Sequence, residues 1–431
     1  MHLGCGLRRL DVIRITLRSE DIEAMRIAII GAGISGLVAA HRLRDEHEVV
    51  VLEAGSYAGG HTNTVDVGPI AVDTGFIVFN DRNYPGFEAL LAELGVASQP
   101  SDMSFGVSDG ADFEYAAHSV PALYANPRHL VDAEFQRMVG EYVRFNRAAT
   151  KLLAGDAEPT LNEWLREQRF SAAFVKKLIV PQAAAVWSAD PEQMWTFPAR
   201  FLVEFFANHG MLGFRKRPQW RTVTGGSRTY VKALTRDLDV RLNTRVRRVE
   251  RFPDRVEVDG EAFDEIVIAT HSDQALTLLA DPSDAEREVL GAIPYQANEA
   301  VLHTDTSLMP RRRRAWASWN YHLGHAGLGG GASVTYWMNR LQSLPGDTDY
   351  LVTLNRTETI EPATKIRTIS YAHPVYTREG MRAQARHGEI SGVNRTHYCG
   401  AYWSWGFHED GLQSGLRAAA GVGRARQAVT A

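Results

Sequence analysis

RIAIIGAGISGLVAAHRLRDEHEVVVLE, residues 26–53, is the stretch that decides the fold of this chain. Residues 26–30 have the continuous apolar character of a buried strand, a glycine-rich turn follows, and residues 37–46 have a helical pattern. A second apolar strand at residues 48–52 ends in Glu53. Strand, tight turn, helix and strand in this order predict a βαβ unit at the start of a doubly wound sheet.

The turn carries the spacing G-x-G-x-x-G at Gly31, Gly33 and Gly36. The first glycine allows the tight turn, the second lets the backbone approach a diphosphate, and the third lets the helix pack closely on the strand. The start of the helix, at Ile34, offers free N–H groups and a positive dipole end to the phosphates. Glu53 lies near the spacing expected of a carboxylate that binds ribose hydroxyls. The sequence therefore predicts a dinucleotide site.

Composition excludes several other classes of protein. A chain of 431 residues is too long for one ordinary core, so we expect two domains. A net charge of -4 provides no broad basic field, which argues against a nucleic-acid partner. The two cysteines cannot form a disulfide framework, which fits a reducing cytoplasm. No apolar run approaches the roughly 20 residues that span a bilayer.

The N-terminal residues 1–24 lack the continuous apolar segment of a signal peptide. Met25 stands directly before the first strand, where a dinucleotide-binding protein would naturally begin. We therefore predict that residues 1–24 are a disordered or mis-assigned extension.

Along the rest of the chain, segments typical of a dinucleotide-binding domain are separated by two segments of different character. Longer helical patterns occupy residues 130–153, 161–168 and 195–212. Residues 240–250 and 255–260 alternate like antiparallel strands. We predict an α/β fold with a Rossmann-like binding domain made of three segments and an inserted, mixed α+β substrate domain. The binding domain is assigned to residues 25–104, 220–285 and 395–425, and the substrate domain to residues 105–219 and 286–394.

NAD and FAD both use such a turn, and the residues after Glu53 distinguish them. The sequence continues A-G-S-Y-A-G-G-H-T, which resembles the flavin amine oxidase superfamily, including its phytoene-desaturase-like and protoporphyrinogen-oxidase-like members. Gly59 and Gly60 match the glycine pair of that family, and His61 stands where arginine is commoner. A histidine that is mostly neutral weakens the contact with the diphosphate. The resemblance implies a non-covalently bound FAD.

The resemblance extends through three further segments. D-T-G-F at residues 73–76 resembles the segment that passes the isoalloxazine, Val246 falls where the family contacts adenine, and residues 406–419 resemble the C-terminal motif whose helix begins under the flavin pyrimidine. A helix N-terminus there stabilises the negative charge of the reduced ring. The resemblance implies a cofactor-binding set made of Gly31, Gly33, Ile34, Ser35, Gly36, Glu53, Ala54, Gly60, His61, Thr62, Thr74, Gly75, Phe76, Val246, Gly400, His408, Glu409 and Gly411.

The chain also resembles a bacterial subgroup of predicted NAD/FAD-binding proteins. The segments W-S, F-F-x-N-H-G and Q-W-R-T-V-x-G-G-S of that subgroup occur here at residues 187–188, 205–210 and 219–227. Such proteins often accompany cyclopropane-fatty-acid-synthase-like enzymes. The association points to unsaturated or methylated fatty acyl chains as substrates.

Three residues are candidates for catalysis, each with a structural alternative. Phe407 aligns with an aromatic wall beside the flavin, or it belongs to the core. His408 is placed for acid–base work, or it belongs to the start of the helix. His303 stands where amine oxidases often have a lysine near the flavin, or it pairs within its strand. The missing lysine argues against direct amine oxidation.

Two further sites of chemistry are not supported. Cys399 is expected to be a buried structural thiol rather than a flavin tether. No cluster of histidine, cysteine and acidic residues has metal-ligand spacing, so no metal is predicted. The aromatic residues Phe197, Phe201 and Phe205 follow a helical spacing, which predicts core packing with one side along an apolar tunnel.

The reaction that the sequence favours is transfer of a hydride from a C–H bond of a lipophilic small molecule or acyl chain to flavin N5, in a desaturase-like manner. Three alternatives stay open: an amine oxidase that uses O₂, a flavin-dependent isomerase or mutase without net redox change, and a flavin-binding protein without catalysis. We expect a cytoplasmic protein, with peripheral membrane contact left open. The electron acceptor and the oligomeric state are not determined by the sequence.

Overall fold

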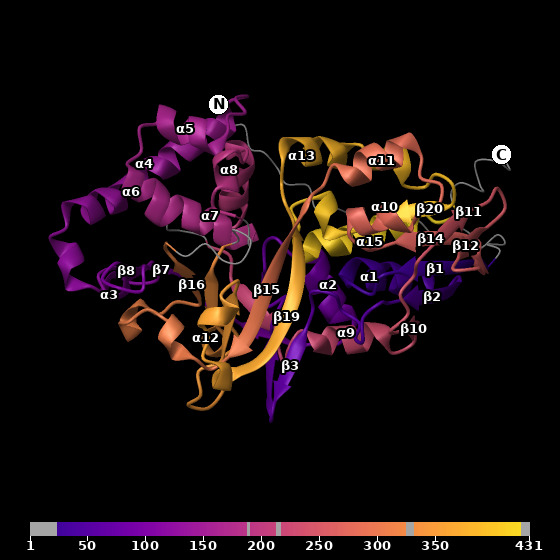
Figure 1. Ribbon diagram of the computed structural model, residues 1–431, viewed down its shortest axis with the longest axis horizontal. Coiled ribbons are helices and arrows are strands. Elements are labelled where there is room, and N and C mark those ends of the chain that lie inside the picture. Colours follow the sequence, from indigo (N-terminus) through magenta and orange to yellow (C-terminus); the bar gives the residue numbers. More distant parts are fainter. Residues whose placement is uncertain (1–23, 188–189, 213–216, 325–331, 424–431) are drawn as a thin grey trace, which may run out of the picture.

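The computed structural model describes residues 24–187, 190–212, 217–324 and 332–423. Residues 1–23 of the predicted N-terminal extension lie outside the described residues, so that hypothesis stays a prediction. Two large β-sheets, each with its own helices, make up most of the described molecule (Figure 1).

The first sheet is the one that the βαβ pattern predicts. Its five strands are all parallel, in the order β10 (Asp239–Arg241), β2 (Glu48–Leu52), β1 (Arg26–Ile30), β14 (Glu265–Ile268) and β20 (Thr396–Tyr398). Strands that are far apart in the chain therefore pair directly. This confirms an α/β, Rossmann-like unit assembled from three segments, whereas the exact domain boundaries stay a prediction.

Both faces of this sheet are buried, which explains its continuous apolar strands. Ile27 and Ile29 face one core and Ala28 and Ile30 face another, because alternate residues of a strand point to opposite faces. The first face is covered by α1 (Ile34–Leu43), α2 (Pro85–Glu93), α9 (Arg228–Thr235) and α15 (His408–Gly421). The second face is covered by β11 (Val249–Arg251), β12 (Val256–Val258), β13 (Glu261–Phe263), α10 (Ser272–Leu278), α11 (Asp284–Gly291), α13 (Arg378–Ala385) and α14 (His387–Ile390).

The second sheet has seven strands and mixed directions. Its order is β19 (Lys365–Pro374), β15 (Tyr295–His303), β18 (Leu351–Leu354), β17 (Val334–Trp337), β16 (Trp319–His322), β7 (Phe105–Ser108) and β8 (Glu114–Ala116). Only the β16–β7 pair is parallel, among the strands described. Two small sheets are separate from the large ones, and they consist of β3 (Thr64–Val67) with β4 (Ile70–Asp73) and of β5 (Phe79–Asn80), β9 (Trp220–Val223) and β6 (Ser98–Pro100). The short helix α12 (Met338–Leu341) lies between β17 and β18 in the chain.

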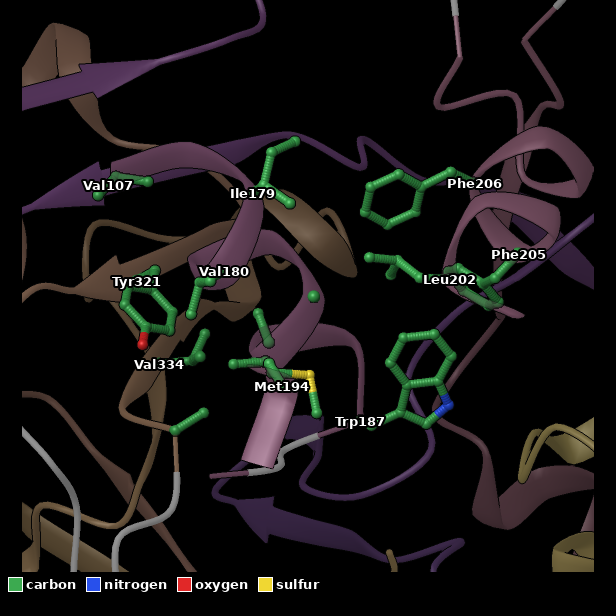
Figure 2. Packing of buried hydrophobic residues seen from close by; sticks show 14 of the residues in the cluster. Val107, Ile179, Val180, Trp187, Met194, Leu202, Phe205, Phe206, Tyr321 and Val334 are labelled. Atoms are coloured by element: carbon green, nitrogen blue, oxygen red, sulfur yellow. The ribbon is translucent and has the colours of Figure 1, made fainter. Parts of the chain in front are cut away.

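A layer of helices packs against the second sheet and forms the largest apolar core. It contains α3 (Val120–Leu123), α4 (Ala133–Ala154), α5 (Leu161–Glu167), α6 (Ala172–Phe174), α7 (Val180–Trp187) and α8 (Ala199–Asn208). Figure 2 shows Trp187 of α7 near Leu202 and Phe205 of α8, whereas Tyr321 and Val334 of the sheet lie beside Val180 of α7. None of the helices in the described ranges combines the length and apolar character that crossing a bilayer requires.

Several predicted elements differ from the structure, each for a local reason. The helix predicted at residues 130–153 begins at Ala133, because the Asp132 side chain caps it by accepting from the N–H groups of Glu134 and Phe135. The helix predicted at 195–212 was too long, since α8 begins after Pro198 and is followed by Gly210 with φ +65°. The alternating run 240–250 is divided, because β10 joins the parallel sheet and only β11 pairs antiparallel with β12.

The contact between α1 and α15 depends on glycines. A Cβ atom on Gly415 would lie 2.3 Å from the Ser35 carbonyl oxygen, and one on Gly411 would lie 2.8 Å from Ile34 Cγ2. On the other side of α1, a Cβ atom on Gly36 would lie 2.0 Å from the Gly31 carbonyl oxygen. The first turn of α1 is therefore fixed between β1 and α15.

We predict that Gly415→Ala lowers the free energy of unfolding by about 1–3 kcal/mol, because the added methyl group meets main-chain atoms that cannot move aside. Gly140→Ala is the matched control, because Gly140 lies on α4 with open space around it and should gain about 0.5–1 kcal/mol. Urea unfolding of both variants measures these changes. Equal stabilisation by both substitutions would contradict the proposed packing.

Candidate active site

A cavity of about 1630 Å³ extends from the glycine turn of the parallel sheet to the seven-stranded sheet. Gly33 and Glu53 line it on one side, and Tyr336 and Leu354 line it on the other. Pockets for one drug-sized ligand usually enclose about 300–1,000 Å³. This cavity therefore has room for a dinucleotide together with a second molecule.

The glycine turn presents backbone to the cavity. Gly31 has φ +106°, a conformation that side chains rarely adopt, and a Cβ atom on Gly33 would meet nothing within 4 Å. No side chain caps the first turn of α1, so its N–H groups and its dipole are available to an anion. The open space at Gly33 is the approach that a diphosphate requires.

Glu53 and a second glycine loop complete this end of the cavity. The Glu53 carboxylate accepts hydrogen bonds from the N–H groups of Ala32 at 2.8 Å and Gly55 at 2.7 Å. The second loop packs on the first, since a Cβ atom on Gly60 would lie 3.2 Å from the Gly33 Cα atom. Gly60 has φ +59°, so glycine is favoured there for its conformation as well as for its size.

His61 follows this loop and lies within a group of aromatic rings. Its ring stacks on Tyr371 with centroids 4.8 Å apart, and the rings of His373 and His271 lie at 5.1 and 6.3 Å. Burial and these neighbouring histidines hold the pKa of His61 well below its usual value, so it is neutral at pH 7. Among the described residues, no group of three histidine, cysteine or acidic side chains is arranged to hold a metal ion.

The start of α15 forms another wall. The His408 ring stacks on Phe76 with centroids 3.7 Å apart. His408 Nε2 lies 2.7 Å from the Tyr230 hydroxyl, which lies 2.6 Å from Thr62 Oγ1. Burial lowers the pKa of His408 to about 3, so the ring is neutral at pH 7. Phe407 adjoins it on the same wall.

This arrangement of a glycine turn and a second helix start has known relatives. The family model of flavin containing amine oxidoreductases matches residues 34–355. The chain belongs to this family. It is therefore an FAD-dependent oxidoreductase, as the resemblance implies.

Among curated relatives, the chain is 26% identical over 197 residues to protoporphyrinogen oxidase 2, chloroplastic/mitochondrial, of Arabidopsis thaliana. The match covers 43% of this chain and only 37% of that relative. Among solved structures, a CLA-producing fatty acid isomerase from P. acnes has a TM-score of 0.65 at 16% identity and covers 91% of this chain and 97% of its own. Cyclohexylamine oxidase from Brevibacterium oxydans has a TM-score of 0.65 at 18% identity and covers 94% of this chain and 100% of its own. These two structures share the fold.

The cavity fits FAD at the residues that the sequence proposes. The open approach at Gly33, the uncapped helix start and the length of the cavity suit a dinucleotide. The predicted residues that line the cavity are Gly31, Gly33, Ile34, Ser35, Glu53, Ala54, Gly60, His61, Thr74, Gly75, Phe76, Val246, Gly400, Phe407 and His408. Their assignment to the cofactor is a proposal that rests on this placement.

Four predicted cofactor residues do not line the cavity. Gly36 and Gly411 are packing glycines on either side of α1. The Thr62 side chain is bonded to Tyr230, and the Glu409 carboxylate accepts from the N–H groups of Gly86 and Phe87 at the start of α2. The two glycines and the side chains of Thr62 and Glu409 thus support the elements that form the site.

His303 is not among the residues that line the cavity, and its contacts favour the structural alternative of pairing within its strand over the catalytic one. It lies at the end of β15, inside the seven-stranded sheet. Its Nε2 lies 2.7 Å from Thr353 Oγ1, and its Nδ1 accepts from the N–H of Asp305. Both ring nitrogens are therefore used for pairing within the sheet region.

His209 is one of the cavity residues that the sequence analysis did not propose, as are His271, Tyr371 and His373. His209 follows α8, its Nδ1 lies 3.0 Å from the Phe205 carbonyl oxygen, and its ring lies 5.8 Å from that of Phe407. The carbonyl contact assigns the proton to Nδ1 and leaves Nε2 as an acceptor. Burial lowers its pKa to about 4. The F-F-x-N-H-G segment was the available signal, but a resemblance alone gave this histidine no role.

We predict that His408→Gln makes stability less sensitive to acid. The folded-state pKa of about 3 lies below the ordinary value, so the stabilising contribution is present above about pH 6.5 and is lost as the pH falls toward 3. Removing this titration should make the decline in unfolding free energy between pH 6 and 4 shallower by about 1.4 kcal/mol per pH unit. Urea unfolding at several pH values measures the slope. Parallel profiles for the two proteins would contradict the assignment.

Proposed function

We propose that this FAD-dependent oxidoreductase removes a hydride from a C–H bond of a lipophilic substrate, an unsaturated or methylated fatty acyl chain being the favoured class. FAD, when bound, supplies the hydride acceptor at N5. The observation that carries the proposal is the apolar lining of the cavity on the side of the substrate sheet. That lining includes Met103, Phe105, Leu123, Met138, Val139, Tyr142, Val143, Leu178, Val186 and Met211.

An aromatic wall separates the cofactor end from this apolar region. Phe407 and Phe205 stack with centroids 5.0 Å apart, and Trp187 lies 4.9 Å from Phe205. These rings provide flat, water-excluding surfaces that align an extended hydrocarbon. The neutral His408 beside them adds no charge that an apolar chain would have to desolvate. The chain's own residues thus supply orientation and dryness.

The carboxylates of the cavity are engaged by the protein, which disfavours an amine substrate. In the described part of the chain, the acidic residues that line the cavity are Glu53, Asp102 and Asp273. Glu53 binds two backbone amides, Asp102 pairs with Arg340 at 3.0 Å, and Asp273 accepts from the Gln274 N–H. Glu53 follows β2 of the parallel sheet, and Asp273 lies on α10, which covers that sheet. Beside the substrate sheet, an ammonium group would therefore meet only Asp102 of these three, and Arg340 already offsets its charge.

The fold is compatible with acyl substrates, since a fatty acid isomerase shares it. It is equally compatible with amines, since cyclohexylamine oxidase shares it as well. The apolar lining of this particular cavity supports the hydrocarbon. Conversion without net redox change is the second candidate, because the same apolar lining would serve an isomerase.

The decisive experiment is anaerobic. The purified yellow protein is mixed with fatty acids, fatty acyl lipids or an amine panel, and the flavin absorbance and product masses are followed. We expect bleaching with an acyl substrate and a product that has lost two hydrogens. Bleaching by amines alone would establish amine oxidation, and a product of unchanged mass would establish isomerisation. Absence of both bleaching and product would leave a non-catalytic flavin protein.

We predict that Phe205→Leu shifts acyl chain-length preference, because Phe205 lines the cavity and a smaller side chain widens it. Phe206→Leu is the matched control, since Phe206 lies one position further on α8 and is buried in the core. The rate of anaerobic bleaching across a chain-length series, normalised to the optimum, measures the preference. If the two variants have the same chain-length profile, Phe205 does not line the proposed tunnel.

A further inference from the structure

Exposed aliphatic side chains gather on one stretch of the helical layer. Val120 is 70% exposed, Leu130 is 59%, Val131 is 87% and Val143 is 44%. These four residues are called the aliphatic patch. Val120 lies in α3, Leu130 ends the 3-10 turn Pro127–Leu130, Val131 follows that turn, and Val143 lies on α4. Figure 1 shows α3 and α4 at the end of the molecule remote from β1 and β2. Exposed apolar side chains that lie near one another on a surface often mark interaction sites.

The aliphatic patch is continuous with the mouth of the substrate cavity. Val120 and Val143 are exposed to solvent and also line the cavity. Leu123 of α3 and Val139 of α4 line it beside them. At Val120 and Val143, exposed aliphatic surface therefore adjoins the lining of the cavity.

The patch is presented by ordered, capped elements. Ser119 caps α3 by accepting from the Ala122 N–H, and Asp132 caps α4. The ring of His129 stacks on Phe135 with centroids 4.0 Å apart, which fixes the turn between them. Local structure thus holds Leu130 and Val131 outward at the cost of exposing them to water.

Cations flank the patch. Arg147 and Lys151 follow Val143 at successive turns of α4, so they continue the same helical face, and both are exposed. Arg217 lines the cavity and is exposed. None of these three cations is in an ion pair within the described residues. Aliphatic residues with adjoining cations form the pattern of a surface that rests on phospholipid, with side chains among the acyl chains and cations at the phosphates.

We propose that the aliphatic patch docks on the surface of a phospholipid bilayer and that the lipophilic substrate enters the cavity from the bilayer. The inference rests on the proposed function for its substrate. A protein partner fits the patch less well, because protein interfaces concentrate binding energy in tryptophan, tyrosine and arginine, and leucine and valine are under-represented there. Because Val120 and Val143 belong to the patch and also line the cavity, an acyl chain that leaves a bilayer at this face could enter the cavity directly.

The test measures binding of the FAD-loaded protein to vesicles, without substrate. The vesicles contain phosphatidylcholine alone or phosphatidylcholine with phosphatidylglycerol, and bound protein is separated by sedimentation. We expect the wild type to bind both and Val131→Asp to lower the partition coefficient roughly tenfold or more, since it replaces an inserted aliphatic group by a charge. Arg147→Gln should lower binding about fivefold on the mixed vesicles only.

Val393→Asp is the matched control, because Val393 is 46% exposed and does not line the cavity. It should bind vesicles like the wild type, and flavin absorbance with the unfolding midpoint checks that each variant is folded. Equal binding by the wild type and Val131→Asp overturns the proposal. A concentration-dependent dimer that Val131→Asp abolishes, without vesicle binding, also overturns it and assigns the patch to self-association.

The proposed reaction is tested separately, with substrate dispersed in detergent. Val131→Asp should bleach at the wild-type rate there, because Val131 does not line the cavity. Vesicle binding without any acyl-dependent bleaching would reject the proposed function and leave the docking surface. Bleaching without vesicle binding would reject the docking surface alone.

Discussion

The close contact between α1 and α15 is the constraint on which the rest of the structure depends. Helix starts belonging to opposite ends of the chain can face one cavity only if their backbones approach within the radius of a side chain. Gly411 and Gly415 allow that approach because they have no side chain where Ile34 and Ser35 pack. The result is a cavity that has an uncapped helix start at the glycine turn and an aromatic wall at the start of α15.

Several histidines that line the cavity are neutral. Burial keeps the pKa values of His61 and His408 well below their usual range, and the pKa of His373 falls to about 4 for the same reason. Their contribution near the cofactor is therefore hydrogen bonding and shape rather than positive charge. At the proposed position of the diphosphate, the helix dipole of α1 would supply the electrostatic attraction that a basic side chain supplies elsewhere.

The substrate end follows a different principle from the cofactor end. Its walls come from a mixed sheet and a helical layer whose apolar residues continue from the core into the cavity and out to α3 and α4. A site built in this way selects by length and shape, and it discriminates weakly between hydrocarbons that differ by one methylene group. Restricting the direction from which substrate arrives is a further means of selection, and a membrane-facing opening would supply it.

The sequence by itself determined the parallel sheet and the cofactor class, and most of the cofactor-binding residues that it proposed line the cavity. These features depend on local spacing: Gly31, Gly33 and Glu53 act within one βαβ unit, so their order in the chain already fixes their geometry. The separate roles of His303 and His209 were decided only by tertiary structure. The sequence left both a catalytic role and pairing within its strand open for His303, and it lies paired with Thr353 inside a sheet. His209 reaches the cavity because α8 ends beside Phe407. Which side of a strand or helix faces a cavity depends on neighbours far away in the chain, and no local pattern records them.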